Sequence, residues 1–133
     1  MSLPPLSSFQ AAIVDLDGTL VDTLGDFTVA LNGTLAELAL PTLERAAIER
    51  MVGKGSEHLI RSALHAVGAH ADRFRDAWEA YQRHYDATNG RHAEVYPGAA
   101  EGLRRLREAG LRLACVTNKP GRFARDLLAA KGL

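Results

Sequence analysis

A short apolar run that leads directly into an acidic turn constrains the fold of this chain more than any other feature. The first run, residues 11–16, overlaps the start of the acidic turn, Asp15-Leu16-Asp17-Gly18-Thr19. A second apolar run, residues 111–116, is followed by Thr117-Asn118-Lys119-Pro120. Runs of this length without alternation are typical of parallel strands that are covered on both faces. Ligands gather where parallel strands end at their carboxyl edge, so we expect the two polar clusters to share one site.

The residues between the two runs show helical patterns throughout. They predict four helices: one with an apolar stripe at Phe27, Leu31, Leu35 and Leu38, one over 44–52, one with Ser56 as its N-cap, and one with an aromatic stripe at Phe74, Trp78, Tyr81 and Tyr85 that we interpret as core packing. Further helices are expected before residue 110 and over 122–130. This order predicts an α/β fold: an incomplete Rossmann-like parallel-sheet core of residues 1–22 and 97–133, with an all-helical cap inserted at 23–96.

The charge and cysteine content narrow the class of protein. Sixteen basic residues balance sixteen acidic residues over the 133-residue chain. From residue 100 onward eight basic and three acidic residues give a net charge of +5, which we interpret as a solvated helix surface rather than a nucleic-acid site. The single cysteine, Cys115, is expected to be a buried strand thiol in a reducing compartment. With no apolar run of membrane-spanning length, we expect a cytoplasmic protein that binds neither nucleic acid nor membrane.

The paired acids suggest phosphoryl chemistry. Two neighbouring carboxylates, Asp15 and Asp17, are costly unless they share a cation or a proton, and Mg²⁺ prefers such oxygen ligands. One carboxylate can act as a nucleophile that becomes an aspartyl-phosphate, while the other transfers a proton. Thr117 offers a hydroxyl for phosphoryl oxygens. An ordinary turn with an Asx hydrogen bond is the alternative for the acidic cluster taken alone.

Residues 14–23 resemble the first motif of haloacid dehalogenase-like hydrolases, residues 116–119 resemble their second, and the insertion is similar to their C1-type cap. The resemblance covers residues 11–133 and implies that Asp15 is the nucleophile and Asp17 the general acid/base. It also implies that the Asp15 carboxylate and the Asp17 main-chain carbonyl bind Mg²⁺. The phosphate-binding residues that it implies are Gly18, Thr19, Thr117 and Asn118. An acid at position 17 favours phosphatases or phosphomutases over true dehalogenases.

Within that family, residues 31–40 and 52–55 most resemble bacterial phosphoglycolate phosphatases. The resemblance implies 2-phosphoglycolate as the substrate, read by a specificity loop of Gly53, Lys54 and Gly55. Lys54 would pair with the substrate carboxylate, although an exposed turn lysine explains it equally well. A sugar-phosphate phosphatase or a phosphoglucomutase-like relative is the alternative activity.

The predicted core has only two strands, and a parallel pair does not stand alone. The family's third motif, with its phosphate-neutralising lysine, and its acidic fourth motif are expected beyond Leu133, and Lys119 belongs to the second motif instead. We therefore expect an N-terminal fragment, and a catalytically silent truncated or assembly module is the second hypothesis. An unpaired apolar sheet edge also predicts self-association.

Overall fold

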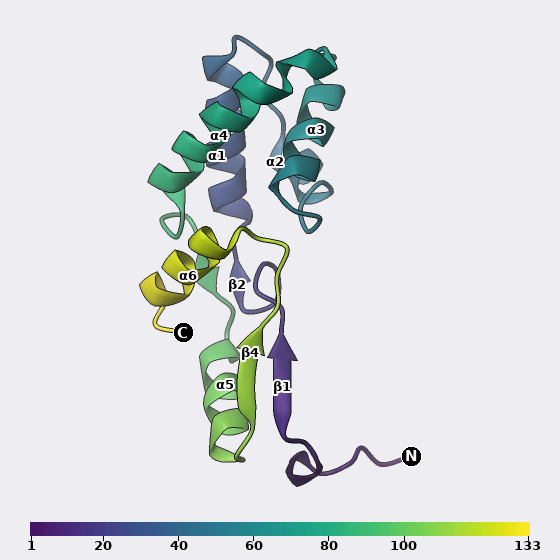
Figure 1. Ribbon diagram of the computed structural model, residues 1–133, viewed down its shortest axis with the longest axis vertical. Helices are drawn as coiled ribbons and strands as arrows, with labels where there is room; N and C mark the ends of the chain where they lie inside the picture. Colours follow the sequence, from purple (N-terminus) through teal and green to yellow (C-terminus); the bar gives the residue numbers. More distant parts are fainter.

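The computed structural model describes all 133 residues, which form an elongated molecule with a helical part at one end and an α/β part at the other (Figure 1). Strand β1 (Ala11–Val14) pairs in parallel with β4 (Arg112–Cys115), with Ala11 opposite Arg112 and Val14 opposite Cys115. Helix α5 (Ala99–Glu108) precedes β4 and helix α6 (Gly121–Ala130) follows it. The predicted α/β class with a parallel sheet is confirmed, and a short 3₁₀ turn, η1 (Leu6–Ser8), precedes the sheet.

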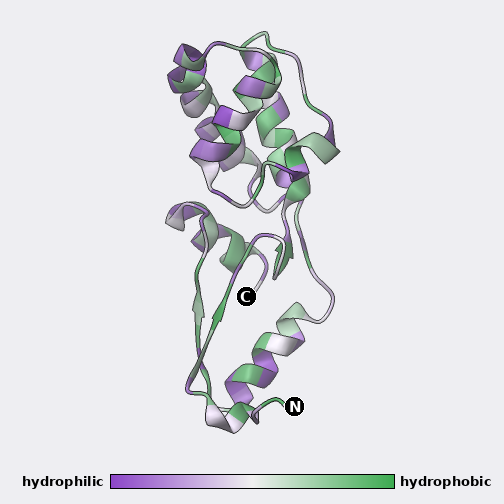
Figure 2. Cartoon of the chain, turned by 90° about the vertical axis from the view of Figure 1, so that its right-hand side faces the viewer, coloured by the Kyte–Doolittle hydropathy of each residue, from purple (hydrophilic) through white to green (hydrophobic).

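The four predicted cap helices are all present as α1 (Leu24–Glu37), α2 (Arg45–Glu49), α3 (Ser56–Ala66) and α4 (Phe74–Thr88), with a 3₁₀ turn, η2 (Ala71–Arg73), before the last. Green and purple alternate around these helices in Figure 2, as expected of amphipathic helices. The predicted N-cap at Ser56 is wrong, because Ser56 is the first helical residue and its side chain makes no capping bond. Gly55 takes the capping position with a φ of +91°, a conformation that favours glycine.

A second, antiparallel pair of strands was not predicted. Strand β2 (Val21–Asp22) pairs with β3 (Glu94–Val95), so the segment that enters the cap lies beside the segment that leaves it. Each strand has two residues, which is too short to produce a recognisable period in the sequence. The pair fixes the two chain crossings between the α/β part and the cap.

The buried apolar residues form two separate clusters. The larger is built from residues 27–85 and one residue of α6, Phe123. The smaller contains Leu16, Leu20 and Val21, together with Ala93, Ala124 and Leu127. Phe123 and Ala93 are therefore the two buried cluster members whose packing crosses the predicted division at 22/23 and 96/97, which itself stays a prediction.

The expectation that both strands are covered on both faces is wrong for this structure. Residues along β1 alternate between exposed and half-buried, and Ile13 is 73% exposed. Val116, just after β4, is 60% exposed, and Cys115 is exposed rather than buried. The reason is that the sheet has only two strands, so the packed elements cannot enclose it. None of the helices combines the length and apolar character needed to cross a bilayer.

Candidate active site

A small pocket of about 60 Å³ lies where the α/β part meets the cap. Asp15 and Asp17 reach it from the loop after β1, and residues 117–120 reach it from the loop after β4. The cap contributes Gly53, Gly55 and Ser56, together with apolar side chains of its helices. The two polar clusters that end the parallel strands therefore do converge, as the strand order predicts.

The acidic turn is held by its own backbone. Gly18 has a φ of +76°, and its N–H donates to the carbonyl oxygen of Val21 at 2.9 Å. Leu16, between the two acids, is completely buried, while Asp15 is exposed on the loop. The Asp15 Oδ1 atom accepts the N–H of Leu16 at 2.8 Å, which leaves Oδ2 without a protein partner. The buried leucine thus anchors a turn from which both acids line the pocket.

Asp17 is fixed by two buried side chains that bind the same oxygen. The Thr23 hydroxyl donates to Asp17 Oδ1 at 2.7 Å, and the Lys119 ammonium lies 3.2 Å from that oxygen. Thr23 is 2% exposed, and so is the Lys119 side chain. Asp17 Oδ2 has no protein partner, so one oxygen is held while the other is available to a ligand.

Lys119 extends from the loop after β4 into the cap. Its ammonium donates to the hydroxyl of Tyr85 and lies 4.6 Å from the ring centres of both Phe27 and Tyr85. Burial lowers the pKa of Lys119, and the nearby Asp17 carboxylate opposes that shift. Burial, followed by Tyr81 and Asp17, raises the pKa of Tyr85. The ammonium is therefore held between an anion of the core and two aromatic rings of the cap.

Sequence reasoning did not identify this cluster as part of the site. The sequence places Lys119 in the second motif and predicts no partner for it, and it predicts that Tyr85 is a core residue. Tyr85 does pack in the apolar cluster, but it also lines the pocket. The only signal in the sequence is the position of Lys119 directly after the polar strand end, and nothing distinguishes Tyr85 from the other aromatic residues of α4.

The structure places the predicted phosphate-binding residues unequally. Thr117 lines the pocket, and its Oγ1 accepts the N–H of Lys119 at 3.1 Å, so its O–H remains available to donate. Asn118 lines the pocket as well, but its Nδ2 donates to the carbonyl oxygen of Gly53 at 2.8 Å. Gly18 lines an adjacent hollow with Asp17, and Thr19 is exposed and lines neither.

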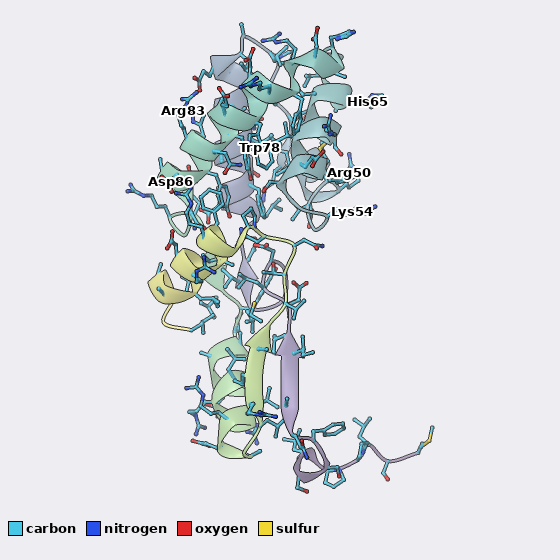
Figure 3. All side chains as sticks on the ribbon, viewed as in Figure 1. Arg50, Lys54, His65, Trp78, Arg83 and Asp86 are labelled. Atoms are coloured by element: carbon cyan, nitrogen blue, oxygen red, sulfur yellow. The ribbon has the colours of Figure 1, made fainter.

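Only part of the predicted specificity loop, residues 53–55, lines the pocket. Gly53 and Gly55 line the pocket, whereas Lys54 is exposed and does not. Figure 3 shows the Lys54 side chain extending outward from the cap loop. In this arrangement the backbone of the loop, rather than its lysine, covers the site.

The donor set of the acidic turn suits a hard cation. The free carboxylate oxygen of Asp15 and the Asp17 main-chain carbonyl are oxygen donors of the type that Mg²⁺ takes, usually together with water and substrate phosphate oxygens. No group of three or more His, Cys, Asp or Glu side chains clusters closely enough to hold a metal ion. The residues present therefore fit Mg²⁺ as a partial ligand set.

Comparison with known proteins adds to this geometry. The chain is 44% identical over 125 residues to a phosphoglycolate phosphatase of Cupriavidus necator, with 92% of this chain and 54% of that protein covered. It is 45% identical over 130 residues to a phosphoglycolate phosphatase of Rhodospirillum rubrum, with 93% and 54% covered. The chain thus spans about half the length of the curated relatives it matches.

The fold has solved counterparts. A crystal structure described as a predicted phosphoglycolate phosphatase from Haemophilus somnus superposes with a TM-score of 0.86 at 28% identity, covering 93% of this chain and 58% of that one. The family model for haloacid dehalogenase-like hydrolases matches residues 9–133, nearly the whole chain. This protein therefore belongs to the haloacid dehalogenase-like hydrolase family.

Proposed function

We propose that the gene product containing this chain hydrolyses small phosphomonoesters, with 2-phosphoglycolate as the main substrate, in the cytoplasm. The observation that carries the proposal is the convergence of Asp15, Asp17 and Thr117 on one pocket between core and cap. The two phosphoglycolate phosphatases at 44% and 45% identity support the choice of substrate.

The proposed reaction uses the two acids in turn. The free carboxylate oxygen of Asp15 attacks the phosphorus atom, the bond from phosphorus to the ester oxygen breaks, and Asp17 gives its proton to the departing alkoxide. In the second half, Asp17 takes a proton from water, whose oxygen attacks the phosphorus of the aspartyl-phosphate. Inorganic phosphate leaves and the Asp15 carboxylate is restored. The Thr117 hydroxyl donates to a phosphoryl oxygen throughout.

The proposed cofactor is Mg²⁺, held by the Asp15 carboxylate and the Asp17 main-chain carbonyl. When bound, it supplies positive charge that offsets the negative charge of the phosphoryl oxygens. The protein side of the site contributes position: Thr23 and Lys119 hold Asp17, and the buried Leu16 holds the turn. Gly53 and Gly55 restrict access from the cap.

The proposal is tested with the complete gene product and a panel of phosphomonoesters assayed with Mg²⁺ and with EDTA. We expect 2-phosphoglycolate to give the highest kcat/KM and EDTA to abolish turnover. Asp15→Asn should lower kcat at least about 1000-fold and eliminate the acid-stable phosphoenzyme, because the nucleophile is lost. Asp126→Asn on exposed α6 makes the same chemical change away from the pocket and should leave turnover intact.

Three outcomes would contradict the proposal. Undiminished hydrolysis by Asp15→Asn would remove the nucleophile assignment. Highest activity on hexose phosphates would assign the protein to the sugar-phosphatase or phosphoglucomutase-like alternative. Inactivity of the complete product toward every phosphomonoester would favour the catalytically silent module.

A further inference from the structure

Lys119 is the only cationic side chain that lines the pocket. An ammonium group has three N–H donors, and here two have partners, the Asp17 carboxylate and the Tyr85 hydroxyl. Its other near neighbours are the aromatic rings of Phe27 and Tyr85, which accept no conventional hydrogen bond. The third N–H of this buried cation therefore has no hydrogen-bond acceptor within the protein, and the side chain lines the pocket.

The position of Lys119 relative to Asp17 indicates which part of a substrate it meets. If Asp17 protonates the ester oxygen, the departing alcohol lies beside Asp17. Lys119 contacts the Oδ1 atom of Asp17 and lies against the rings of Phe27 and Tyr85 in the cap. In 2-phosphoglycolate a single carbon atom separates the ester oxygen from the carboxylate. A cation in contact with the proton donor is therefore within reach of that carboxylate.

We propose that Lys119 is the specificity-determining residue that binds the carboxylate of the departing group. This inference rests on the proposed phosphatase function and adds a residue that selects the substrate. The first turn of α3 supports the same position, because Gly55 and Ser56 line the pocket and the N-terminus of an 11-residue helix favours negative charge. Lys54, the alternative residue for this role, is exposed outside the pocket.

The energetic reason is desolvation. A buried ammonium has lost most of its hydration, and one carboxylate partner compensates it only in part. A second carboxylate oxygen that accepts the free N–H stabilises the cation further through a charge-assisted hydrogen bond. A substrate with an uncharged tail of the same shape makes no such bond. Discrimination between the two tails therefore measures the contact.

The experiment compares 2-phosphoglycolate with its amide, in which an NH₂ group replaces one carboxylate oxygen, on the complete gene product. The quantity measured is the ratio of kcat/KM for the acid to kcat/KM for the amide. We expect Lys119→Met to lower this ratio at least about ten-fold, because the charge-assisted bond to the acid is lost while the aliphatic stem still packs. Lys54→Met makes the same change at the exposed position and should preserve the ratio.

The remaining outcomes separate the two proposals. An equal loss for acid and amide in folded Lys119→Met would overturn the inference, since Lys119 would then act on Asp17 alone. A ratio that falls in Lys54→Met instead would return the role to the cap-loop lysine. A wild-type enzyme that hydrolyses both esters without preference refutes only the inference, whereas one that hydrolyses neither refutes the phosphatase function. If Lys119→Met does not fold, as judged by its melting curve, Lys119→Gln replaces it and is judged by the same ratio.

Discussion

Gly25 and His92 are in direct contact where the two chain segments between core and cap pass each other. A Cβ atom on Gly25 would overlap the carbonyl oxygen of His92, which is backbone and cannot move aside like a flexible side chain. Gly25 lies in the first turn of α1, and His92 lies just before β3. Only glycine permits so close an approach, so this contact sets the spacing of the two crossings.

We expect Gly25→Ala to lower the free energy of unfolding by about 1–3 kcal/mol, the usual cost of forcing an extra carbon into a packed position. Urea denaturation followed by circular dichroism measures the change. Gly102→Ala is the matched control, because a Cβ there would meet nothing within 4 Å inside α5. That change should stabilise the helix by roughly 0.5–1 kcal/mol. Equal effects at the two glycines would contradict the close contact.

Asp26 binds the returning segment through its carboxylate. Oδ2 accepts the N–H of Gly90 and Oδ1 accepts the N–H of His92, both at 2.7 Å, and Asp26 is completely buried. Asp26→Asn keeps the shape but turns one acceptor into a donor that faces an N–H. We expect a loss of about 3 kcal/mol in the free energy of unfolding, the range for a buried bond to a charged group.

Asp86→Asn provides the comparison, since Asp86 forms an exposed ion pair with Arg122. Its effect should be within about 1 kcal/mol of zero, as for most surface pairs. The urea denaturation midpoints of Asp26→Asn and Asp86→Asn, measured under the same conditions, test this difference in stability. A neutral Asp26→Asn would mean that the two backbone bonds contribute little.

Thr23 holds Asp17 without entering the pocket itself. Thr23→Val keeps the shape of the side chain and removes the hydroxyl that binds Asp17 Oδ1. In the complete gene product we expect kcat to fall about ten-fold with little change in KM, because a lost positioning bond acts on the transition state more than on substrate binding. Thr28→Val, whose hydroxyl binds the backbone of Leu24 in α1, should leave kcat unchanged. A change in KM alone would contradict the positioning role.

Cys115 is exposed, yet partial burial, followed by the negative charges of Asp15 and Asp17, raises its pKa. A raised pKa means less thiolate at a given pH, so the folded 133-residue chain should react with iodoacetamide near pH 8 more slowly than the urea-unfolded chain. Asp15→Asn removes one of the charges, lowers the pKa and should speed the reaction. Asp126→Asn should leave the rate unaltered. Alkylation at equal rates in all forms would contradict the electrostatic effect.

The free edge of β1 should promote association of the 133-residue chain. β1 pairs only with β4, and Ile13 exposes an apolar side chain on it. We expect sedimentation velocity to show a concentration-dependent increase in mass, because unpaired strand edges accept further strands. Ile13→Lys should shift this association to higher concentration, whereas Val29→Lys on the exposed side of α1 should have less effect. A monomer at every concentration would exclude the edge as an interface.

The local sequence pattern alone predicts several elements of this structure. The apolar run before Asp15 predicts a strand, and the turn that follows predicts where its carboxylates lie, because a buried Leu16 and a glycine with positive φ allow little else. The stripe that begins at Phe27 predicts α1 in the same way. The convergence of the two polar strand ends also follows, since it depends only on the strands being parallel neighbours.

Tertiary structure alone decided what surrounds those acids. The contact of Lys119 with Tyr85 joins residues 34 positions apart, and it exists because α6 and the cap helices pack around Phe123. Hydrophobic periodicity predicts neither the short β2–β3 pair nor the exposure of Cys115. The pair depends on a partner strand that is distant in sequence. The exposure of Cys115 depends on how few strands the sheet contains. Sequence pattern placed the two acids, whereas long-range packing determined that Lys119 is buried beside Asp17 and that Lys54 remains in solvent.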